Sequence, residues 1–138
     1  MTKATLDQDK IVSSDQAVQD FLRKVTKIIL LFLKDQNAPK ELHRSVLKFT
    51  KVAITYLDFN KDIDMTNVIM SHIFSLKDSK KYSMTLRRII TKLIIRVGVE
   101  KLKQVTVKDH HPLIAYVERI RRKKQNVKER ARLLALLG

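Results

Sequence analysis

The chain of 138 residues contains only two glycines, two prolines and no cysteine. Hairpin turns need glycine, asparagine or proline, so this composition argues against a β-sheet fold and predicts an all-α protein, either one domain or a piece of a larger one. The absence of cysteine excludes disulfides, cysteine-ligated zinc and a thiol nucleophile.

The formal charge of +15 is concentrated in the second half of the chain. Residues 1–79 contain 12 Lys and Arg against 10 Asp and Glu, whereas residues 80–138 contain 17 against 4, which gives net charges of +2 and +13. This asymmetry predicts a polyanionic partner for the second half, nucleic acid first and an anionic membrane surface second. Basic charge that only keeps the protein soluble is the alternative.

No segment resembles a membrane span or a signal peptide. The longest unbroken apolar run, Ile28–Leu33, has six residues, whereas a span needs about 20. The first ten residues include acidic groups and lack an apolar stretch. We therefore expect a soluble intracellular protein that has no membrane partner.

The first helix is predicted from about residue 15 to residue 36, after a flexible N-terminus over residues 1–13. Ser13, Ser14 or Asp15 is a suitable N-cap. The second half of the helix, IILLFL, is apolar on all sides, which is unusual for a helix at the edge of a domain. We infer that upstream repeats or another subunit cover Ile28–Leu33.

Further helices follow in order, each bounded by residues that begin or end helices. Gly98 stands where a glycine ends a helix, and a short fifth helix follows it. The predicted boundaries are Pro39 to about Asp58, Asp62 or Asp64 to Leu76, Asp78 or Ser79 to Val97, and Val99 to about Val105.

The second and fourth helices have similar patterns. A shift of forty residues places Val46 on Leu86 and Phe49 on Ile89, and it places Lys40 on Lys80. A helix–turn–helix unit that recurs at about forty residues is typical of HEAT and armadillo repeats. We predict about two such repeats over residues 14–107; a plain antiparallel bundle is the alternative.

A basic C-terminal helix is predicted over residues 108–138. Arg119–Arg132 leaves no room for an apolar face and should contact an anion. Leu133–Leu137 is a separate apolar cluster that suits either the protein's own surface or a partner's groove. Four apolar residues should anchor the start of the helix on the last repeat: Leu113, Ile114, Val117 and Ile120.

The predicted RNA-binding surface is formed by cations of this helix together with cations of the fourth helix, where Arg88, Lys92 and Arg96 follow one another at four-residue spacing. Like charges four residues apart destabilise a helix by a few tenths of a kcal/mol per pair, which favours a role in which phosphates neutralise them. No aromatic residue follows Tyr116, so phosphate contact is expected rather than base stacking, with salt-sensitive affinity. The predicted RNA-binding residues are Arg87, Arg88, Lys92, Arg96, Arg119, Arg121, Arg122, Lys123, Lys124, Lys128, Arg130 and Arg132.

No pattern indicates catalysis, a metal or a cofactor. His110 and His111 would point about 100° apart on a helix, and no third ligand lies at helical spacing, so Asp109 is interpreted as an N-cap and the histidines as part of a helix entry. His43 and His72 are expected at the surface or its boundary. Without a glycine-rich loop or a Ser/His/Asp arrangement, we expect no enzyme activity and no cofactor.

The order of the last segments resembles a known family. RRIITKLIIRVGVEKL, a short link and DHHPLIAYVERIRRKK are similar to the C-terminal end of the ribosomal-RNA-processing protein twelve family, which are large HEAT-repeat ribosome-biogenesis factors. The likeness covers about residues 38–130 and is most specific over 86–124. It is carried by Arg87, Arg88, Ile94, Ile95, Arg96, Val97 and Gly98, then Asp109, His110 and His111, then Arg119, Arg121, Arg122, Lys123 and Lys124.

The resemblance implies a non-enzymatic scaffold of the nucleus and nucleolus. Such a scaffold would bind ribosomal RNA precursors and ribosome assembly or ribosomal proteins, and would assist maturation and export of small-subunit precursors. Nuclear transport factors are further expected partners, because Arg121–Lys124 also fits an import signal. Family chains are many times longer and their basic tails usually continue, whereas this chain closes on LLALLG. The alternative is a helical protein-interaction scaffold whose basic helix binds an acidic protein or an import receptor.

Overall fold

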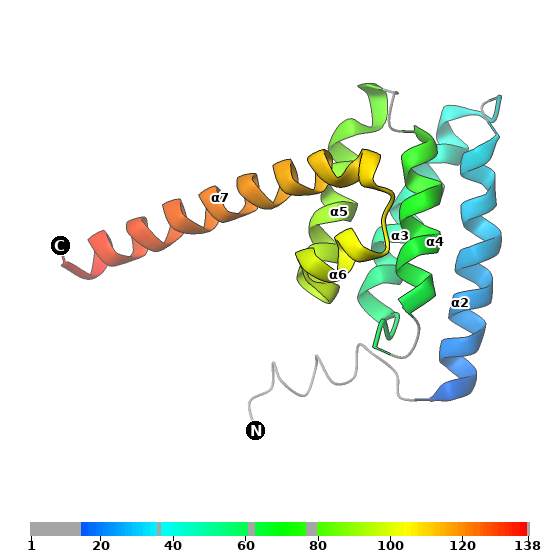
Figure 1. Cartoon of the computed structure of the whole chain (residues 1–138), viewed down its shortest axis with the longest axis horizontal. Coiled ribbons are helices and arrows are strands. Elements are labelled where there is room, and N and C mark those ends of the chain that lie inside the picture. The colour runs from blue at the N-terminus through cyan, green and yellow to red at the C-terminus, as the bar shows by residue number, and fades with distance from the viewer. Residues whose placement is uncertain (1–14, 36, 61–62, 77–79, 138) are drawn as a thin grey trace.

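The computed structural model describes residues 15–35, 37–60, 63–76 and 80–137, and within these residues the chain forms helices and no strands. Figure 1 shows most helices standing side by side, with one long helix projecting away from them. The all-α prediction is therefore confirmed. The predicted flexible segment 1–13 and the proposed caps Ser13, Ser14, Asp62, Asp78 and Ser79 lie outside the described residues.

The helices follow the predicted order. Several end or begin in short 3-10 turns, labelled η. The elements are α2 (Gln16–Leu30), η1 (Leu31–Lys34), α3 (Lys40–Tyr56), α4 (Ile63–Ile73), η2 (Phe74–Leu76), η3 (Lys80–Tyr82), α5 (Ser83–Val97), α6 (Val99–Gln104), η4 (Lys108–His110) and α7 (His111–Leu137).

Helix α2 begins where the sequence predicted and ends earlier. Asp15 is its N-cap, and its Oδ1 accepts the backbone N–H of Ala17 at 2.9 Å. The α-helix stops at Leu30 and tightens into η1, after which Asp35 is extended. The Asp35 carboxylate accepts the N–H of Asn37 at 3.0 Å, so a local turn replaces the last predicted turn of helix.

Gly98 separates α5 from α6, as predicted. Its φ of +87° is a conformation that glycine adopts without the steric cost of a Cβ. The Gly98 N–H still donates to the Ile94 carbonyl at 2.8 Å, which closes the last turn of α5, and α6 begins at the next residue. The chain therefore changes direction within one residue and brings α7 back onto α5.

Parallel pairs of helices organise the first part of the fold. The Tyr82 hydroxyl lies 3.5 Å from His43 Nδ1 near the start of α3 and α5, and Arg96 Nη2 donates to the Leu57 carbonyl at 2.7 Å at their other end. Both contacts join residues 39 positions apart. Helices α3 and α5 thus run side by side in the same direction, at nearly the offset seen in the sequence.

The other pair, α2 and α4, is arranged in the same way. Ser75 Oγ donates to the Leu33 carbonyl at 3.1 Å, so the two helices end together. The buried Gln19 connects the start of α2 to the end of α3, because its side chain donates to the Tyr56 carbonyl and accepts the Asp58 N–H, both at 3.0 Å. Helices α2 and α3 thus form an antiparallel hairpin, and the next two helices lie beside it, α4 along α2 and α5 along α3.

The core lies between these helices and is aliphatic. Apolar positions that recur at three and four residues in the sequence are the ones that become buried. Helices α6 and α7 also contribute, through Leu102 and Ile114. Each fully buried aliphatic side chain contributes about 1.5–3 kcal/mol. Fully buried members include Leu30, Leu33, Leu47, Ile54, Ile69, Ile73, Ile89, Ile90 and Leu93.

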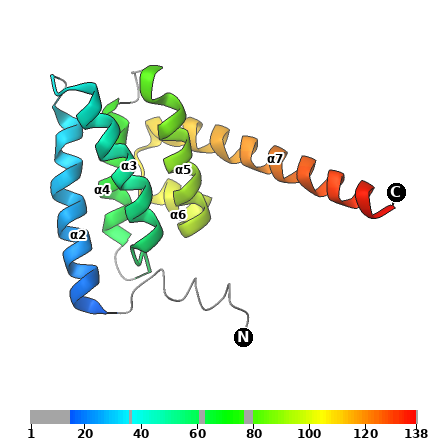
Figure 2. The same ribbon diagram turned by 180° about the vertical axis from the view of Figure 1, so that it is seen from behind.

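The outer side of α2 and η1 carries exposed apolar residues, among which lie the exposed lysines Lys24, Lys27 and Lys34. Helix α2 forms one edge of the molecule in Figures 1 and 2, and only one side of it packs on the described helices. Cover by upstream repeats or another subunit remains a prediction. The exposed residues are Val18, Phe21, Ile28, Leu31 and Phe32.

None of the described helices combines the length and the apolar character that crossing a bilayer requires. Helix α7 is long, with 27 residues, but its middle is cationic. The remaining described helices have 17 residues or fewer.

We predict that Leu93→Ala destabilises the protein by about 2–5 kcal/mol, because Leu93 is fully buried and its removal leaves a cavity. Ile95→Ala is the matched control on the same helix. Ile95 is 65% exposed, so its substitution should change stability by less than about 0.5 kcal/mol. Urea unfolding followed by circular dichroism measures both values, and similar values for the two variants would contradict this packing.

Candidate nucleic-acid interface

The start of α7 is anchored on α5 and α6, as predicted. Ile114 and Val117 are buried, and Leu113 packs against the core. Ile120 is half-buried. Asp109 lies in η4 rather than at the N-cap position of α7, which begins at His111. The apolar anchor therefore holds about the first ten residues of α7 and leaves the rest unsupported.

The rest of α7 projects into solvent. Every described residue from Arg122 onward is exposed, and Figures 1 and 2 show this part of the helix extending away from the other helices. The stretch 122–137 carries six Lys and Arg against one carboxylate, Glu129. A helix that is polar nearly all round gains its stability from a partner or from solvent-exposed pairs. The predicted cations Lys123, Lys124, Lys128, Arg130 and Arg132 all lie here.

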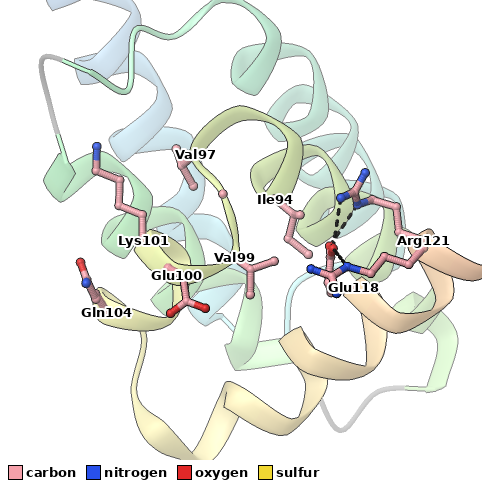
Figure 3. Close-up of a pocket in the computed structure, with 10 residues that line it drawn as sticks. Ile94, Val97, Val99, Glu100, Lys101, Gln104, Glu118 and Arg121 are labelled. Atoms are coloured by element: carbon pink, nitrogen blue, oxygen red, sulfur yellow. Dashed lines mark hydrogen bonds and ion pairs between the residues drawn. The ribbon is translucent and has the colours of Figure 1, made fainter. Parts of the chain in front are cut away.

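Helices α2–α6 are called the platform below. Two predicted cations bind Glu118 at the point where α7 leaves this platform (Figure 3). Arg121 donates from Nε to Glu118 Oε2 at 3.0 Å and from Nη2 to Oε1 at 3.1 Å. Arg122 Nε donates to Oε1 at 2.8 Å. Glu118 is buried, so it needs these partners. The hydrogen bond from Arg121 lowers the pKa of Glu118 below its ordinary value despite the opposing effect of burial.

Tyr116 holds two further predicted cations. The guanidinium of Arg87 lies 5.1 Å from the centre of its ring, and that of Arg119 lies 5.8 Å from it. These distances suit cation–π contacts, which at exposed sites contribute about 0.5–1 kcal/mol. Arg87 on α5 and Arg119 on α7 are thereby brought into one cluster, although 32 positions separate them in the sequence.

Lys92 and Arg96, two further predicted cations, hydrogen-bond to groups near the end of α3. Lys92 Nζ donates to the Lys51 carbonyl at 3.3 Å and lies 3.5 Å from Thr55 Oγ1, while Arg96 binds the Leu57 carbonyl. A helix C-terminus carries partial negative charge, which nearby cations neutralise. Arg96 binds the C-cap Leu57 and Lys92 binds within the two turns before it, so both side chains stabilise the end of α3, while Arg87 and Arg88 are the α5 cations that line the groove next to α7.

A groove of about 370 Å³ lies between α5 and α7. It brings together predicted residues from both helices, which the sequence alone does not place near one another. Its lining is cationic and apolar, and none of the described residues that line it is acidic. The residues are Met84, Arg87, Arg88, Thr91, Val117, Ile120, Arg121, Lys124, Gln125 and Lys128.

A second basic cluster was missed from the sequence. Lys40, Arg44 and Lys81 converge where α3 and α5 begin, and contact with the Lys40 ammonium lowers the pKa of Lys81 below its ordinary value, with repulsion from Lys40 and Arg44 acting in the same direction. The signal was present in the forty-residue shift that aligns Lys40 with Lys80. Because parallel helices at this offset place their first turns together, residues 40 and 81 become neighbours.

The histidines contact other parts of the fold, and the prediction that His43 and His72 lie at the surface or its boundary is wrong. His43 and His72 are buried, not at the surface: His43 Nε2 donates to the Asp35 carbonyl at 2.9 Å, and His72 Nδ1 to the Val68 carbonyl at 2.7 Å. His110 stacks on Phe74 with ring centres 3.8 Å apart. Within the described ranges no group of three or more His, Asp or Glu residues is arranged to hold a metal ion.

We predict that Glu118→Gln destabilises the protein by about 1 kcal/mol at neutral pH, because a buried, charged acceptor of three hydrogen bonds is lost, while the exposure of Arg122 to water weakens its part of the ion pair. Glu118 has a lowered pKa in the folded state, so its contribution is present above the ordinary carboxyl pKa and is lost as the pH falls through the lowered value.

Urea unfolding of the wild type and the variant at several pH values checks this. The difference in stability between them should be largest at neutral pH and should shrink on acidification. Glu129→Gln is the control, because Glu129 is exposed and should change stability by less than about 0.5 kcal/mol. A difference that grows as the pH falls would contradict the ion-pair geometry.

Comparison of the chain with protein-family models, with curated proteins and with solved structures finds no match. The function is therefore inferred from the charges, contacts and exposed surfaces described above, together with the quoted resemblance of residues 86–124.

Proposed function

We propose that this protein is a non-enzymatic helical scaffold that binds RNA through α7. The observation that supports the proposal is the projecting part of α7, where six cations stand against one carboxylate and every described residue is exposed. Of these cations only Arg122 has an ion pair with another described residue. The phosphates of a polyanion would neutralise the repulsion among the others.

The contacts expected from such a surface are with the phosphate backbone. Lysine and arginine on an exposed helix attract phosphates at long range and release counterions when they bind. Contacts of this kind position a nucleic acid without reading its sequence. The proposed interface contains Arg87, Arg88, Arg119, Arg121, Arg122, Lys123, Lys124, Lys128, Arg130 and Arg132.

The platform is proposed to be HEAT-like. The helices stack so that contacts between α3 and α5 join residues 39 to 41 positions apart, which is the geometry expected of adjacent repeats. Stacked repeats generally need about three units for stability. The exposed apolar residues of α2 and η1 accordingly support the proposal that upstream repeats or another subunit cover this side of the molecule.

The biological setting is proposed from the resemblance to the ribosomal-RNA-processing protein twelve family. Ribosomal RNA precursors are then the RNA partner, and ribosome assembly proteins or ribosomal proteins are the protein partners, in the nucleus and nucleolus. Maturation and export of small-subunit precursors is the process. Nuclear transport factors are further proposed partners, because Arg121–Lys124 would also serve as an import signal.

A protein-interaction scaffold is the second candidate, and the tip of α7 favours it. Leu133, Leu134, Leu136 and Leu137 are all exposed, and Leu137 is 85% exposed. Phosphate binding gives these side chains no role, whereas a helix that enters a partner's apolar groove would bury them. An acidic protein or an import receptor would suit both the leucines and the neighbouring cations.

We predict that Lys123→Gln/Arg130→Gln/Arg132→Gln weakens RNA binding and lowers the slope of log affinity against log salt by about 2–3, or about one per cation removed. None of these side chains makes a hydrogen bond or ion pair with another described residue, so folding should be unchanged. Fluorescence anisotropy with a structured RNA, from low to moderate salt, measures the slope.

The matched control is Lys24→Gln/Lys27→Gln/Lys34→Gln, which removes the same charge from exposed positions of α2 and η1. Its salt slope should stay close to that of the wild type. Equal losses in the two triple variants would mean that net charge, rather than α7, determines binding. Absence of binding at low salt would refute the RNA-binding function.

For the second candidate, we predict that Leu134→Asn/Leu137→Asn abolishes nuclease-resistant capture of protein partners and leaves RNA affinity within about twofold, because both leucines are exposed and uncharged. Affinity capture from nuclease-treated extract measures the first effect and anisotropy the second. Unchanged capture would exclude the leucine cluster as the docking surface.

A further inference from the structure

We propose that the groove between α5 and α7 binds an unpaired nucleotide of the RNA, with its base on the apolar floor and its phosphates at the cationic rim. This inference rests on the proposed RNA-binding function and deepens it, because it makes single-stranded RNA the preferred ligand of this site. It also revises the expectation from the sequence that contacts are made to phosphates only.

The lining of the groove has two chemical parts. The apolar part, called the floor here, is made by the buried Val117, the half-buried Ile120 and the exposed Met84. The neutral polar Thr91 and Gln125 also line the groove. The rim carries five cations, and no described lining residue is acidic. The rim residues are Arg87, Arg88, Arg121, Lys124 and Lys128. A nucleotide matches this division, since its base has flat, weakly polar faces and its phosphates are anionic.

The rim combines preorganised and free cations. Arg87 is held over the Tyr116 ring and Arg121 is held by Glu118, so these two guanidinium groups are already positioned. Arg88, Lys124 and Lys128 have no hydrogen bond or ion pair with another described residue. The groove therefore offers fixed charges, which cost little entropy on binding, beside mobile ones that can adapt to the path of the phosphates.

The size of the groove favours a nucleotide over a protein helix or an RNA duplex. A helix with its side chains is about 10–12 Å across and would rest on the rim rather than enter a space of about 370 Å³. A duplex keeps its bases paired and presents only phosphates, which would leave Met84 uncovered. An unpaired base fits the space, and the flexible thioether of Met84, which is 64% exposed, can adjust to its face.

A larger neighbouring cavity does not have this character. It measures about 550 Å³ and is lined by Gly98, α6 residues and the Glu118 region (Figure 3). Its lining has three cations, Lys101, Arg121 and Arg122, against two carboxylates, Glu100 and Glu118, which is a net charge of +1, whereas the groove lining has five cations and no carboxylate. Size alone therefore does not identify the anion site. The charge of the lining selects the smaller groove.

The test uses the full chain in fluorescence anisotropy, with oligouridylate of about 12 nucleotides and a blunt RNA duplex of equal length as probes. Met84→Glu places a negative charge on the floor, and Arg88→Gln/Lys128→Gln removes two rim cations that bind nothing in the protein. Ile95→Glu is the matched control, because Ile95 is similarly exposed on α5 and does not line the groove.

We expect Met84→Glu to weaken binding of oligouridylate about tenfold, because it removes an apolar contact to the base, and to weaken duplex binding by less than about threefold. The rim variant should weaken both probes. Ile95→Glu should leave both nearly unchanged, and circular dichroism should be the same for all variants.

Other outcomes overturn the inference. If Met84→Glu does not reduce oligouridylate binding while the Lys123/Arg130/Arg132 variant still does, the RNA-binding function stands and the groove is excluded as the nucleotide site. If the wild type binds neither probe, both the groove proposal and the RNA-binding function are refuted. An oligoglutamate peptide tests the remaining case. If it binds the wild type, displaces oligouridylate and binds Met84→Glu more weakly, the groove is a site for acidic peptides.

Discussion

The short anchor of α7 is the constraint on which the functional surface depends. A helix of 27 residues is about 40 Å long, and only its first third is packed on α5 and α6. Ile114 and Val117 supply the buried apolar contact, and Glu118 ends it by binding Arg121 and Arg122. From Arg122 onward every described residue is exposed, so the rest of the helix stays in solvent with its cations displayed. The turn at Gly98 together with α6 and η4 brings the start of α7 back onto α5.

Lysine and arginine have two different roles in this molecule, and location decides between them. Near the end of α3, Lys92 and Arg96 neutralise backbone carbonyls and complete a helix terminus. On α7, the same residue types meet few carboxylates and, among the described residues, hydrogen-bond to no carbonyl outside their own helix, so their charge is directed at solvent. Arg121 lies between the two groups, since it is fixed by Glu118 and yet lines the groove. The strong positive charge of the second half is therefore partly structural.

Exposed apolar surface lies at two distant places, the outer face of α2 and the tip of α7 (Figures 1 and 2). Burial of either surface would be favourable, because apolar area removed from water contributes about 25 cal/mol per Å². A scaffold that joins partners needs more than one such surface on a rigid body. Between them, the stacked helices provide a core whose aliphatic side chains are fully buried, which keeps the geometry of the α5–α7 groove constant.

The sequence by itself determined the order of the helices, the break at Gly98 and the apolar residues that hold α7, and it left Asp15 as one of three candidate caps, because capping and three-to-four periodicity are local properties of the chain. Tertiary structure alone decided that His43 and His72 are buried, that Lys92 and Arg96 bind α3, and that cations of α5 and α7 share one groove. Periodicity reports which side of its own helix a residue occupies, and it says nothing about the neighbour on that side. The neighbours here lie about forty positions away, and packing between helices brings them together.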